Sequence, residues 1–371
     1  IVHAFHSFYP AIGGMETAIK CLAEEQVKMG HEVHVVTSLI QGKARNEVIN
    51  GVQIHRVKTI RFHYPDLTLP REIPREILKK ADIVHVHSQN SLFSVKMLEE
   101  SDKLAVKTAC YFMAVDAFNK SPDPLIRLLA PYYGRMNTLK ALRMSDLLLV
   151  KSIRDLKILR EKYGVEATYL PDGVPDYYFT VKKDTSDVFR RRFGIRQQNF
   201  FLYIGRMHRL KGPHILVKAL KYVSENVAAV FIGPDGGYLS ETLSLAERIG
   251  VKDRVYVLGY VDEETKIQAI DSATALVLPS ITEYVEVYPM VISEAWTREK
   301  PVIASSVGGI PYRIKHGING ILVAPSDYRM LANAMLELID NNKLAEEMGR
   351  NGRKEVLSWR EVTLKSIELY R

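Results

Sequence analysis

The sequence predicts an α/β protein with two doubly wound domains, in which mostly parallel strands alternate with helices. Short apolar, β-rich runs recur along the chain, and helical patterns separate many of them, which favours right-handed crossovers and parallel sheets. The alternation stops once, in a turn-rich and charged stretch at residues 171–194, and then starts again. The 371 residues, of which 47% are hydrophobic, suffice for two or three domains.

Composition excludes several classes of protein. Charged residues make up 25% of the chain and aromatic residues 9%, as in ordinary globular proteins. No apolar run approaches the roughly 20 residues that span a bilayer, and no secretory signal is evident. The two cysteines form neither a disulfide framework nor a metal-ligand set. We therefore expect a cytoplasmic protein, and its formal net charge of +8 favours anionic partners such as phosphates, nucleic acid or an anionic membrane surface.

The first domain is expected at residues 1–173, the second at 174–357, and a terminal helix at 358–371. The strands of the first domain are expected in IVHAFH, HEVHVVTS, GVQIHRVK, ADIVHVHS, KLAVKTAC, SDLLLVKS and ATYLPDG. Those of the second are expected in FFLYIGR, AAVFIGPD, RVYVLGYV, ATALVLPS, KPVIASSV and GILVAP. Because ligands bind beyond the carboxyl ends of parallel strands, two such domains facing each other would place a site in the cleft between them.

A glycine pair, Gly13 and Gly14, follows the first strand and precedes an amphipathic helix. Backbone N–H groups exposed at such a helix start can approach an oxygen-rich ligand. The alternative is a tight turn without a ligand. The pair is not part of a GxGxxG dinucleotide fingerprint, and no P-loop sequence occurs in the chain.

Two further features of the first domain have a structural and a functional interpretation. His85 and His87 lie two residues apart on one strand, where packed side chains are more common than a metal site without a third ligand. No Asp-x-Asp pair occurs to hold a nucleotide-bound divalent ion, so we expect no metal. Residues 124–144 combine leucines, tyrosines and basic residues without an acid, which suits either an interfacial helix on an anionic membrane or a core helix with a basic outer face. Pro131 and Gly134 are expected to interrupt this helix.

In the second domain, Arg206 ends a strand and Lys211 begins the next helix. A guanidinium fork and an ammonium point charge in these positions would bind one diphosphate, and the alternative is a solvated basic turn. The GPDGG turn at 233–237 and the LGYVDEE segment at 258–264 also follow strands. Their exposed backbone suits a base or a ribose, or it belongs to purely structural loops.

The strongest single segment is 279–301, PSITEYVEVYPMVISEAWTREKP. If the helix starts near Met290, Glu286 lies in the loop before it and Glu294 lies just over one turn inside, with free N–H groups between them. Carboxylates beside an anion site suit a ligand with both hydroxyls and phosphate, such as a sugar nucleotide. The alternatives are a solvated pair of glutamates, or Glu283 in the place of Glu286.

In order and strand-end placement these segments resemble glycosyltransferase family 4, the retaining transferases of the GT-B fold, which has two Rossmann-like domains facing across a cleft. The resemblance covers GGMETAIKCLAEEQVKMGHEVHVVT, PDGV, GRMHRLKG, GPDGG, VYVLGYVDEE, the E-x7-E element, KPVIASSVGGIPYRIKHGINGILVAP and SWREV. It implies catalytic roles for Arg206, Lys211 and Glu286. The donor-binding residues that it implies are Gly14, Gly205, Arg206, Lys211, Gly233, Tyr260, Glu286, Met290, Val291 and Glu294. On the acceptor side it implies Gly13 and His87, with Tyr111 or Asp116 in place of a histidine that many members carry and this chain lacks.

The resemblance implies transfer of a hexose from a UDP- or GDP-sugar to an acceptor hydroxyl with retention of configuration. The acceptor would be a glycan, another carbohydrate or a lipid-linked molecule, and no cofactor, metal or nucleic acid would take part. A lipid-linked acceptor would place the protein at the inner face of the membrane. The alternatives are an epimerase or hydrolase of nucleotide sugars with the same fold, and a non-catalytic protein that binds sugar nucleotides. Pro289 and Tyr312 depart from the family pattern, in which glycine and glutamate are common at these positions.

Overall fold

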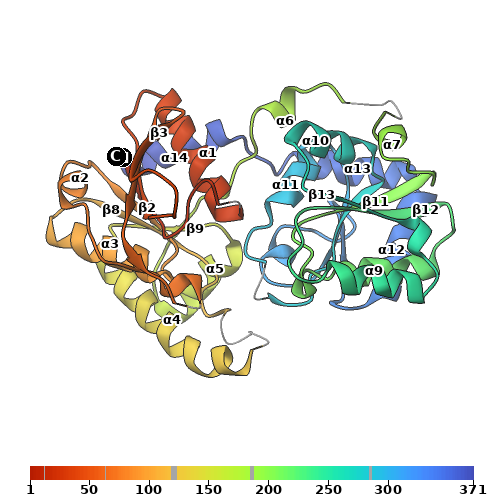
Figure 1. The fold of residues 1–371 in the computed structure, drawn as a ribbon, viewed down its shortest axis with the longest axis horizontal. Helices are drawn as coiled ribbons and strands as arrows, with labels where there is room; N and C mark the ends of the chain where they lie inside the picture. Colours follow the sequence, from red (N-terminus) through yellow and green to blue (C-terminus); the bar gives the residue numbers. More distant parts are fainter. Residues whose placement is uncertain (12, 63, 118–122, 184–187, 284–285) are drawn as a thin grey trace. The chain divides into compact units, whose positions relative to one another are not determined.

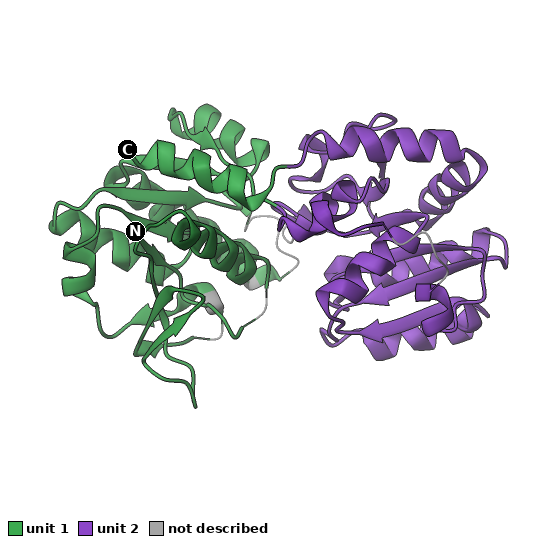
Figure 2. Ribbon diagram, turned by 90° about the horizontal axis from the view of Figure 1, so that it is seen from above, with its two compact units in different colours: residues 1–173, 357–371 green, residues 174–356 purple. Residues whose placement is uncertain are grey.

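A computed structural model describes residues 1–11, 13–62, 64–117, 123–183, 188–283 and 286–371 of the chain (Figure 1). The chain divides into two compact units (Figure 2). Unit 1 comprises Ile1–Gly173 and Leu357–Arg371, and unit 2 comprises Val174–Val356. Each unit contains one large, mostly parallel sheet with helices on its faces, which confirms the predicted fold class of two doubly wound, Rossmann-like domains.

The sheet of unit 1 has eight strands in the order β10-β9-β8-β7-β1-β2-β4-β3. Their bounds are β1 Val2–Ala4, β2 His34–Ser38, β3 Asn46–Ile49, β4 Val52–Val57, β7 Val84–His87, β8 Thr108–Phe112, β9 Leu147–Val150 and β10 Thr168–Tyr169. All neighbours pair in parallel except β3 and β4, which form an antiparallel hairpin at one edge. The sequence did not predict β3, because its residues are polar or half-exposed instead of forming an apolar run.

Helices cover both faces of this sheet. They are α1 Gly14–Lys28, α2 Arg75–Lys79, α3 Leu92–Lys103, α4 Pro124–Met144, α5 Ile153–Ile158 and α14 Trp359–Tyr370. Ile19 and Ala23 of α1 pack with Val35 on one face, whereas Phe93 of α3 packs with Val36 on the other. A small antiparallel pair, β5 Thr59–Ile60 and β6 Leu69–Pro70, stands apart from the main sheet.

The predicted interruption of the helix at 124–144 is wrong, because α4 is continuous and Pro131 lies inside it. A proline removes one backbone hydrogen bond and strains the preceding turn. In α4, packing offsets this cost. Gly134 and Asn137 are buried, and the helix packs against α3 and β8. Tertiary packing therefore holds the helix where local propensity would break it.

The sheet of unit 2 has six parallel strands in the order β13-β12-β11-β14-β15-β16. Their bounds are β11 Asn199–Ile204, β12 Val227–Ile232, β13 Val255–Gly259, β14 Ala275–Leu278, β15 Val302–Ser305 and β16 Ile321–Val323. The order of strands reverses between β11 and β14, which makes this pair a topological switch point. The six apolar runs predicted as strands of the second domain all form strands.

The helices of unit 2 are α6 Tyr177–Thr180, α7 Val188–Arg192, α8 Pro213–Ala219, α9 Leu239–Arg248, α10 Glu263–Ser272, α11 Met290–Thr297, α12 Tyr328–Asp340 and α13 Asn342–Arg353. Two hydrophobic cores fill the two faces of the sheet, one under α8, α9 and α12 and one under α10 and α11. Alternate residues of β11 enter opposite cores, as with Phe200 and Phe201. Buried on both faces, the sheet has a rigid carboxyl edge from which its loops extend.

The helices within the described ranges fall short of the length and apolarity that crossing a membrane requires.

Candidate functional site

Two of the predicted donor residues, Lys211 and Glu286, meet at the switch point of unit 2. Lys211 follows β11 in a short 3₁₀ turn, Arg209–Lys211, and Glu286 lies in the loop after β14. Lys211 Nζ lies 2.7 Å from Glu286 Oε1, so two residues that are 75 positions apart form an ion pair. This pair lies where the sheet topology leaves a crevice for a ligand.

Close backbone packing holds these loops. Gly212 has φ of +71° and lies against Pro279, where a Cβ atom would come within 2.0 Å of the carbonyl oxygen. Gly308, with φ of +57°, would likewise place a Cβ 2.1 Å from the carbonyl oxygen of Glu286, to which Gly309 N–H donates at 2.8 Å. Because only glycine tolerates both the positive φ and the contact, these positions fix the loop that carries Glu286.

The environment of the ion pair is polar and largely buried on the carboxylate side. Glu286 is 2% exposed, and the Ser280 hydroxyl donates to its Oε1 atom. Burial raises the pKa of Tyr203, Glu286 raises it further, and Arg206 opposes both. That hydroxyl donates to the backbone oxygen of Arg206 at 2.7 Å, while the Arg206 side chain is exposed. Lys211 is thus held by a buried carboxylate, and the exposed Arg206 follows the same strand, β11.

Helix α11 begins at Met290, as predicted, and Pro289 occupies its N-cap without a side-chain cap. The N–H groups of Met290 and Val291 thus stand at the start of a helix whose first turn suits an anion. Arg313 braces this end, because its Nη1 donates to the Pro289 carbonyl at 2.7 Å and its guanidinium lies 3.8 Å above the ring of Tyr288.

Glu294 lies one turn inside α11 and is 8% exposed. Its Oε1 accepts from Lys266 Nζ at 3.2 Å, whereas its Oε2 is buried without a hydrogen-bond partner among the described residues. Burial raises the pKa of Glu294, the Lys266 ammonium lowers it and Glu263 raises it, with a net upward shift. A buried acceptor without a donor is costly, and a ligand hydroxyl would satisfy it.

The sequence did not point to Lys266, which proves to be the partner of Glu294. It lies in α10 between Glu294 and Glu263, 3.0 Å from the latter, and above the ring of Tyr178. Burial lowers the pKa of Lys266, but the two carboxylates outweigh this effect and the net shift is upward. In the sequence, Glu263 and Lys266 look like an ordinary surface pair three residues apart, and only the fold brings Glu294 to them.

The other predicted donor residues lie at the same carboxyl edge. Gly205 and Gly233 follow β11 and β12, and a Cβ atom on Gly233 would come within 2.2 Å of the Gly205 carbonyl oxygen. Tyr260 follows β13 and is 67% exposed. The strand that Tyr260 follows, β13, lies two strands away from β11. A ligand that contacts both Tyr260 and the Lys211–Glu286 pair would therefore have to be long, with a different part at each.

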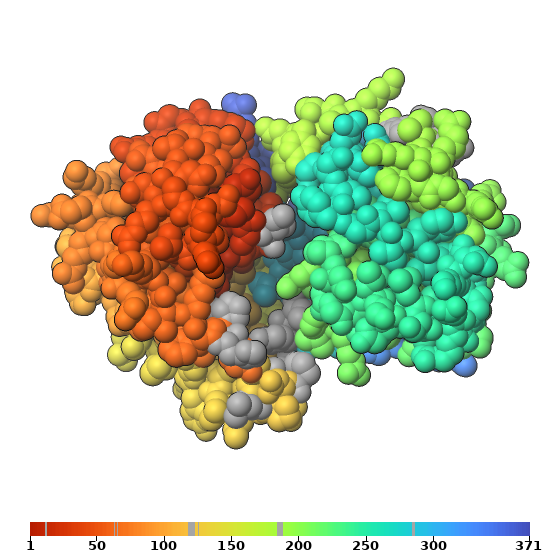
Figure 3. Space-filling model, viewed as in Figure 1, coloured from red at the N-terminus to blue at the C-terminus, as the bar shows by residue number. Residues whose placement is uncertain are grey.

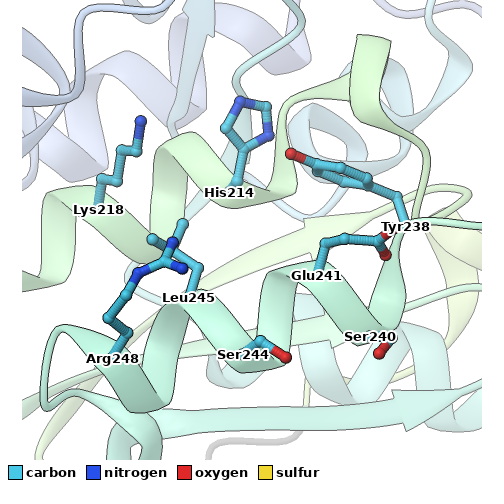
Figure 4. A pocket seen from close by; sticks show the side chains of 8 residues that line it. All are labelled: His214, Lys218, Tyr238, Ser240, Glu241, Ser244, Leu245 and Arg248. Carbon is cyan, nitrogen blue, oxygen red and sulfur yellow. The ribbon is translucent and has the colours of Figure 1, made fainter.

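A cavity of about 410 Å³ lies elsewhere on unit 2, between α8 and α9 (Figure 4). It is lined by His214, Lys218, Tyr238, Ser240, Glu241, Ser244, Leu245 and Arg248. None of the predicted donor residues contributes to this lining, so the cavity is separate from the Lys211–Glu286 pair.

In unit 1, the predicted glycines stand at a helix start. Gly13 is the N-cap of α1 in an extended conformation, and Gly14 is the first residue of the helix. A Cβ atom on Gly14 would meet no atom within 4 Å. Internal packing therefore does not require glycine at position 14, and its role in binding the donor stays a prediction.

His87 belongs to a buried cluster with His3 and His85, whose ligand atoms lie within 4.8 Å of one another. Three histidines could hold a metal, but His3 bonds through both nitrogens, to His87 Nε2 at 3.0 Å and to Gln26 Oε1 at 2.7 Å. His85 Nδ1 lies 2.6 Å from the Tyr370 hydroxyl of α14. Burial lowers the pKa of all three histidines, which favours their neutral form. The contact of His85 with Tyr370 joins α14 to the sheet, whereas His85 Nε2 and His87 Nδ1 are buried without a hydrogen-bond partner among the described residues.

The remaining acceptor-side predictions also stay untested. Tyr111 is 2% exposed and donates to the Leu170 carbonyl at 3.3 Å. Asp116 is half-buried, pairs with Lys162 at 2.9 Å and accepts from the Tyr163 hydroxyl at 3.0 Å. Both side chains thus have partners inside unit 1.

Comparisons with known proteins identify the family of the chain. The family model for Glycosyltransferase Family 4 matches residues 12–178, and that for Glycosyl transferases group 1 matches residues 186–355. The chain is similar to an uncharacterised glycosyltransferase of Methanocaldococcus jannaschii, with 26% identity over 97% of this chain and 94% of the relative. It is also similar to N-acetyl-alpha-D-glucosaminyl L-malate synthase of Bacillus anthracis, with 25% identity over 94% and 90% of the two chains. Among solved structures, HepE of Anabaena in complex with UDP has a TM-score of 0.80 at 18% identity, over 99% of this chain and 98% of HepE.

Proposed function

Because the chain belongs to glycosyltransferase family 4, with the GT-B fold, we propose that it transfers a hexose from a nucleoside diphosphate sugar to an acceptor hydroxyl with retention of configuration. One observation carries the proposal. The Lys211–Glu286 ion pair lies at the switch point of unit 2, between the loops that follow β11 and β14, and a diphosphate and its sugar would bind there, between Arg206 and the start of α11.

Breaking the bond between the sugar and the diphosphate leaves positive charge on the sugar and negative charge on the leaving group. Arg206, Lys211 and the N–H groups of Met290 and Val291 would stabilise the leaving diphosphate, and fixed donors of this kind act most strongly in a site without water. Their two cations supply the charge that a divalent metal would otherwise bring. We therefore propose a metal-independent reaction without a cofactor.

The ion pair also fixes the position of the sugar. Lys211 Nζ and Glu286 Oε1 are 2.7 Å apart, so a diphosphate bound by Lys211 holds its sugar next to Glu286. The buried, unpartnered Oε2 of Glu294 would accept a hydrogen bond from a ribose hydroxyl. No protein nucleophile is required if the leaving phosphate takes the proton of the acceptor on the same face of the sugar.

We propose a UDP- or GDP-sugar as the donor, in keeping with the UDP bound by HepE. The acceptor would be a carbohydrate or a lipid-linked molecule reached in the cytoplasm at the inner membrane face. A panel of UDP-, GDP- and ADP-sugars in thermal unfolding identifies the donor, since a ligand at 100 times its dissociation constant adds about 2.7 kcal/mol of stability.

Arg206→Ala and Glu294→Ala test the site with the donor found in this way. Both variants are expected to lose donor binding and transfer while circular dichroism remains that of the parent. Arg209→Ala is the matched control, because Arg209 is an exposed cation of the same loop without an assigned role. Near-normal turnover in both site variants would refute the assignment. Release of free sugar or of an epimer from the donor alone would instead indicate a hydrolase or an epimerase, and binding without turnover a non-catalytic protein.

A further inference from the structure

Helix α4 exposes an apolar stripe that the fold of unit 1 does not use. Leu128, Tyr132, Met136 and Leu139 follow one another at helical spacing and are between 39% and 79% exposed, and Leu129 beside them is 57% exposed. Residues three or four apart share one face of a helix. On a helix at the surface of a globular protein this face would normally be polar.

The charges on the same helix have a single sign. Arg127, Arg135, Lys140 and Arg143 are exposed, and α4 contains no aspartate or glutamate. Lys140 Nζ lies 3.6 Å from Glu99 Oε1 of α3, and this is the only salt bridge that any of these four cations forms with the described residues. The exposed face of α4 therefore combines large apolar groups with positive charge.

The opposite face of α4 is firmly attached. Asn137, Thr138 and Ala141 are buried, and the Tyr133 hydroxyl donates to the Asn90 carbonyl at 2.6 Å and to the Asp66 carbonyl at 3.4 Å. Since these contacts anchor the helix, its outer face is free to meet a partner. Figure 3 shows α4, coloured yellow, at the surface of unit 1.

A second exposed apolar element lies near the start of α4. Phe62 is 54% exposed and Ile60 40%, with the exposed cation Arg61 between them. Tyr64 connects this segment to α4, because its hydroxyl donates to Asp123 Oδ2 at 3.4 Å, one residue before the helix begins. The apolar and basic surface thus extends beyond a single helix.

We propose that the α4 face, defined as Arg127, Leu128, Leu129, Tyr132, Arg135, Met136, Leu139, Lys140 and Arg143, docks on an anionic lipid bilayer. The helix would lie parallel to the bilayer, with its apolar side chains among the headgroups and its cations against lipid phosphates. Charge complementarity selects this partner, because a continuous anionic surface matches four cations without a single acid. A lipid surface can also bury an irregular apolar stripe, because lipids do not need to form a groove of matching shape.

The inference rests on the proposed function in one respect only, namely that docking would bring a lipid-linked acceptor to the enzyme. Vesicle binding needs neither donor nor acceptor. Its failure would leave the donor site of unit 2 unaffected, and failure of the donor site would leave vesicle binding intact.

The test is co-sedimentation of the full chain with vesicles of phosphatidylcholine alone or mixed with phosphatidylglycerol. The parent is expected to bind the mixed vesicles, to bind the neutral ones weakly, and to dissociate as salt rises. Leu128→Ser/Tyr132→Ser and Arg127→Glu/Arg135→Glu are each expected to weaken binding by about tenfold or more. Thermal unfolding and donor binding of both variants should match the parent.

The control is Arg360→Glu/Leu364→Ser on α14 of the same unit, which replaces one exposed cation and one exposed leucine. It should bind mixed vesicles as the parent does. The proposal is overturned if the parent does not bind the mixed vesicles, or if it binds neutral and mixed vesicles equally well. It is also overturned if the α4 variants bind mixed vesicles as strongly as the control variant does. Loss of self-association in the α4 variants, without any vesicle binding by the parent, would assign the face to a second copy of the chain.

Discussion

The two units share one architecture but differ in the chemistry of their buried polar groups. In unit 2, the loops after β11 and β14 hold the Lys211–Glu286 pair, and helices α10 and α11 hold the Lys266–Glu294 pair. Unit 1 also buries an ion pair, Lys151 with Asp172, but its strands β1 and β7 add a cluster of three histidines, His3, His85 and His87, whose pKa values burial lowers. Burial of an ion pair is costly and rarely adds stability, whereas neutral imidazoles can be buried once they are hydrogen-bonded.

This difference indicates a division of labour. The two lysine–glutamate pairs of unit 2 remain charged although desolvation is costly. Such pairs suit a ligand that itself carries charge. In unit 1, His85 instead joins α14 to the sheet through Tyr370, which is a structural task. Two kinds of experiment test this difference. Substitutions can replace the charged side chains of unit 2 by neutral ones, and acid pH can protonate the histidines of unit 1.

The largest effect is expected from Lys211→Met. Loss of one contact to a transition-state charge typically costs about 10²–10³ in rate. The variant also leaves Glu286 buried without its cation, which should lower the free energy of unfolding by about 1–3 kcal/mol. Transfer assays and thermal unfolding measure the two losses separately.

The double variant Lys211→Met/Glu286→Gln separates catalysis from packing. It removes both charges, so the unfolding temperature should return toward that of the parent while transfer remains lost. Recovery of transfer together with stability would mean that the pair is only structural.

Acidification should destabilise unit 1 more than unit 2. Burial lowers the pKa of His3 and of His6 to about 4 and that of His85 and His87 well below the ordinary 6.5. The unfolded chain therefore binds more protons below pH 6.5, and stability that is complete above this pH is lost as pH falls toward 4, by about 1.4 kcal/mol per pH unit for each histidine. Asp66, whose pKa burial raises to about 6, offsets part of this loss.

Two tryptophans allow each unit to be followed alone. Trp296 lies in unit 2 and Trp359 in unit 1, and both are buried. In Trp296→Phe the fluorescence of Trp359 should report an unfolding temperature that falls steeply between pH 7 and pH 5. In Trp359→Phe the slope should be shallower, because His214 is the one described histidine of unit 2 with a lowered pKa. Equal slopes would contradict the contrast between the units.

Lys266→Met should weaken donor binding by about tenfold, the effect of one hydrogen bond to a charged group. Without the ammonium, the pKa of Glu294, which burial already raises, should rise further. The acid limb of donor binding, measured by calorimetry, should then move to higher pH. Lys266→Arg should restore much of the affinity and move the limb back. Unchanged pH dependence in Lys266→Met would show that Lys266 acts only in packing.

The sequence predicted the strands well because their apolar runs are buried on both faces and separated by turn signals. It missed β3, whose four residues at the sheet edge are partly exposed. It placed Arg206, Lys211, Glu286 and Glu294 in one site by resemblance and strand-end position, and the structure joins Lys211 directly to Glu286. It missed Lys266 and Arg313 because their partners lie 28 and 24 residues away along the chain, a pairing that only the fold determines.

The smallest effect on stability, and the sharpest test of unit 1, comes from Gly14→Ala. A Cβ atom at this position meets no neighbour within 4 Å, and alanine favours a helix over glycine by about 0.5–1 kcal/mol. The unfolding temperature should therefore stay or rise slightly. If the donor approaches the backbone at the start of α1, the Michaelis constant for the donor should rise nonetheless. A variant that is more stable and equally active would remove Gly14 from the donor site and leave donor recognition to unit 2 alone.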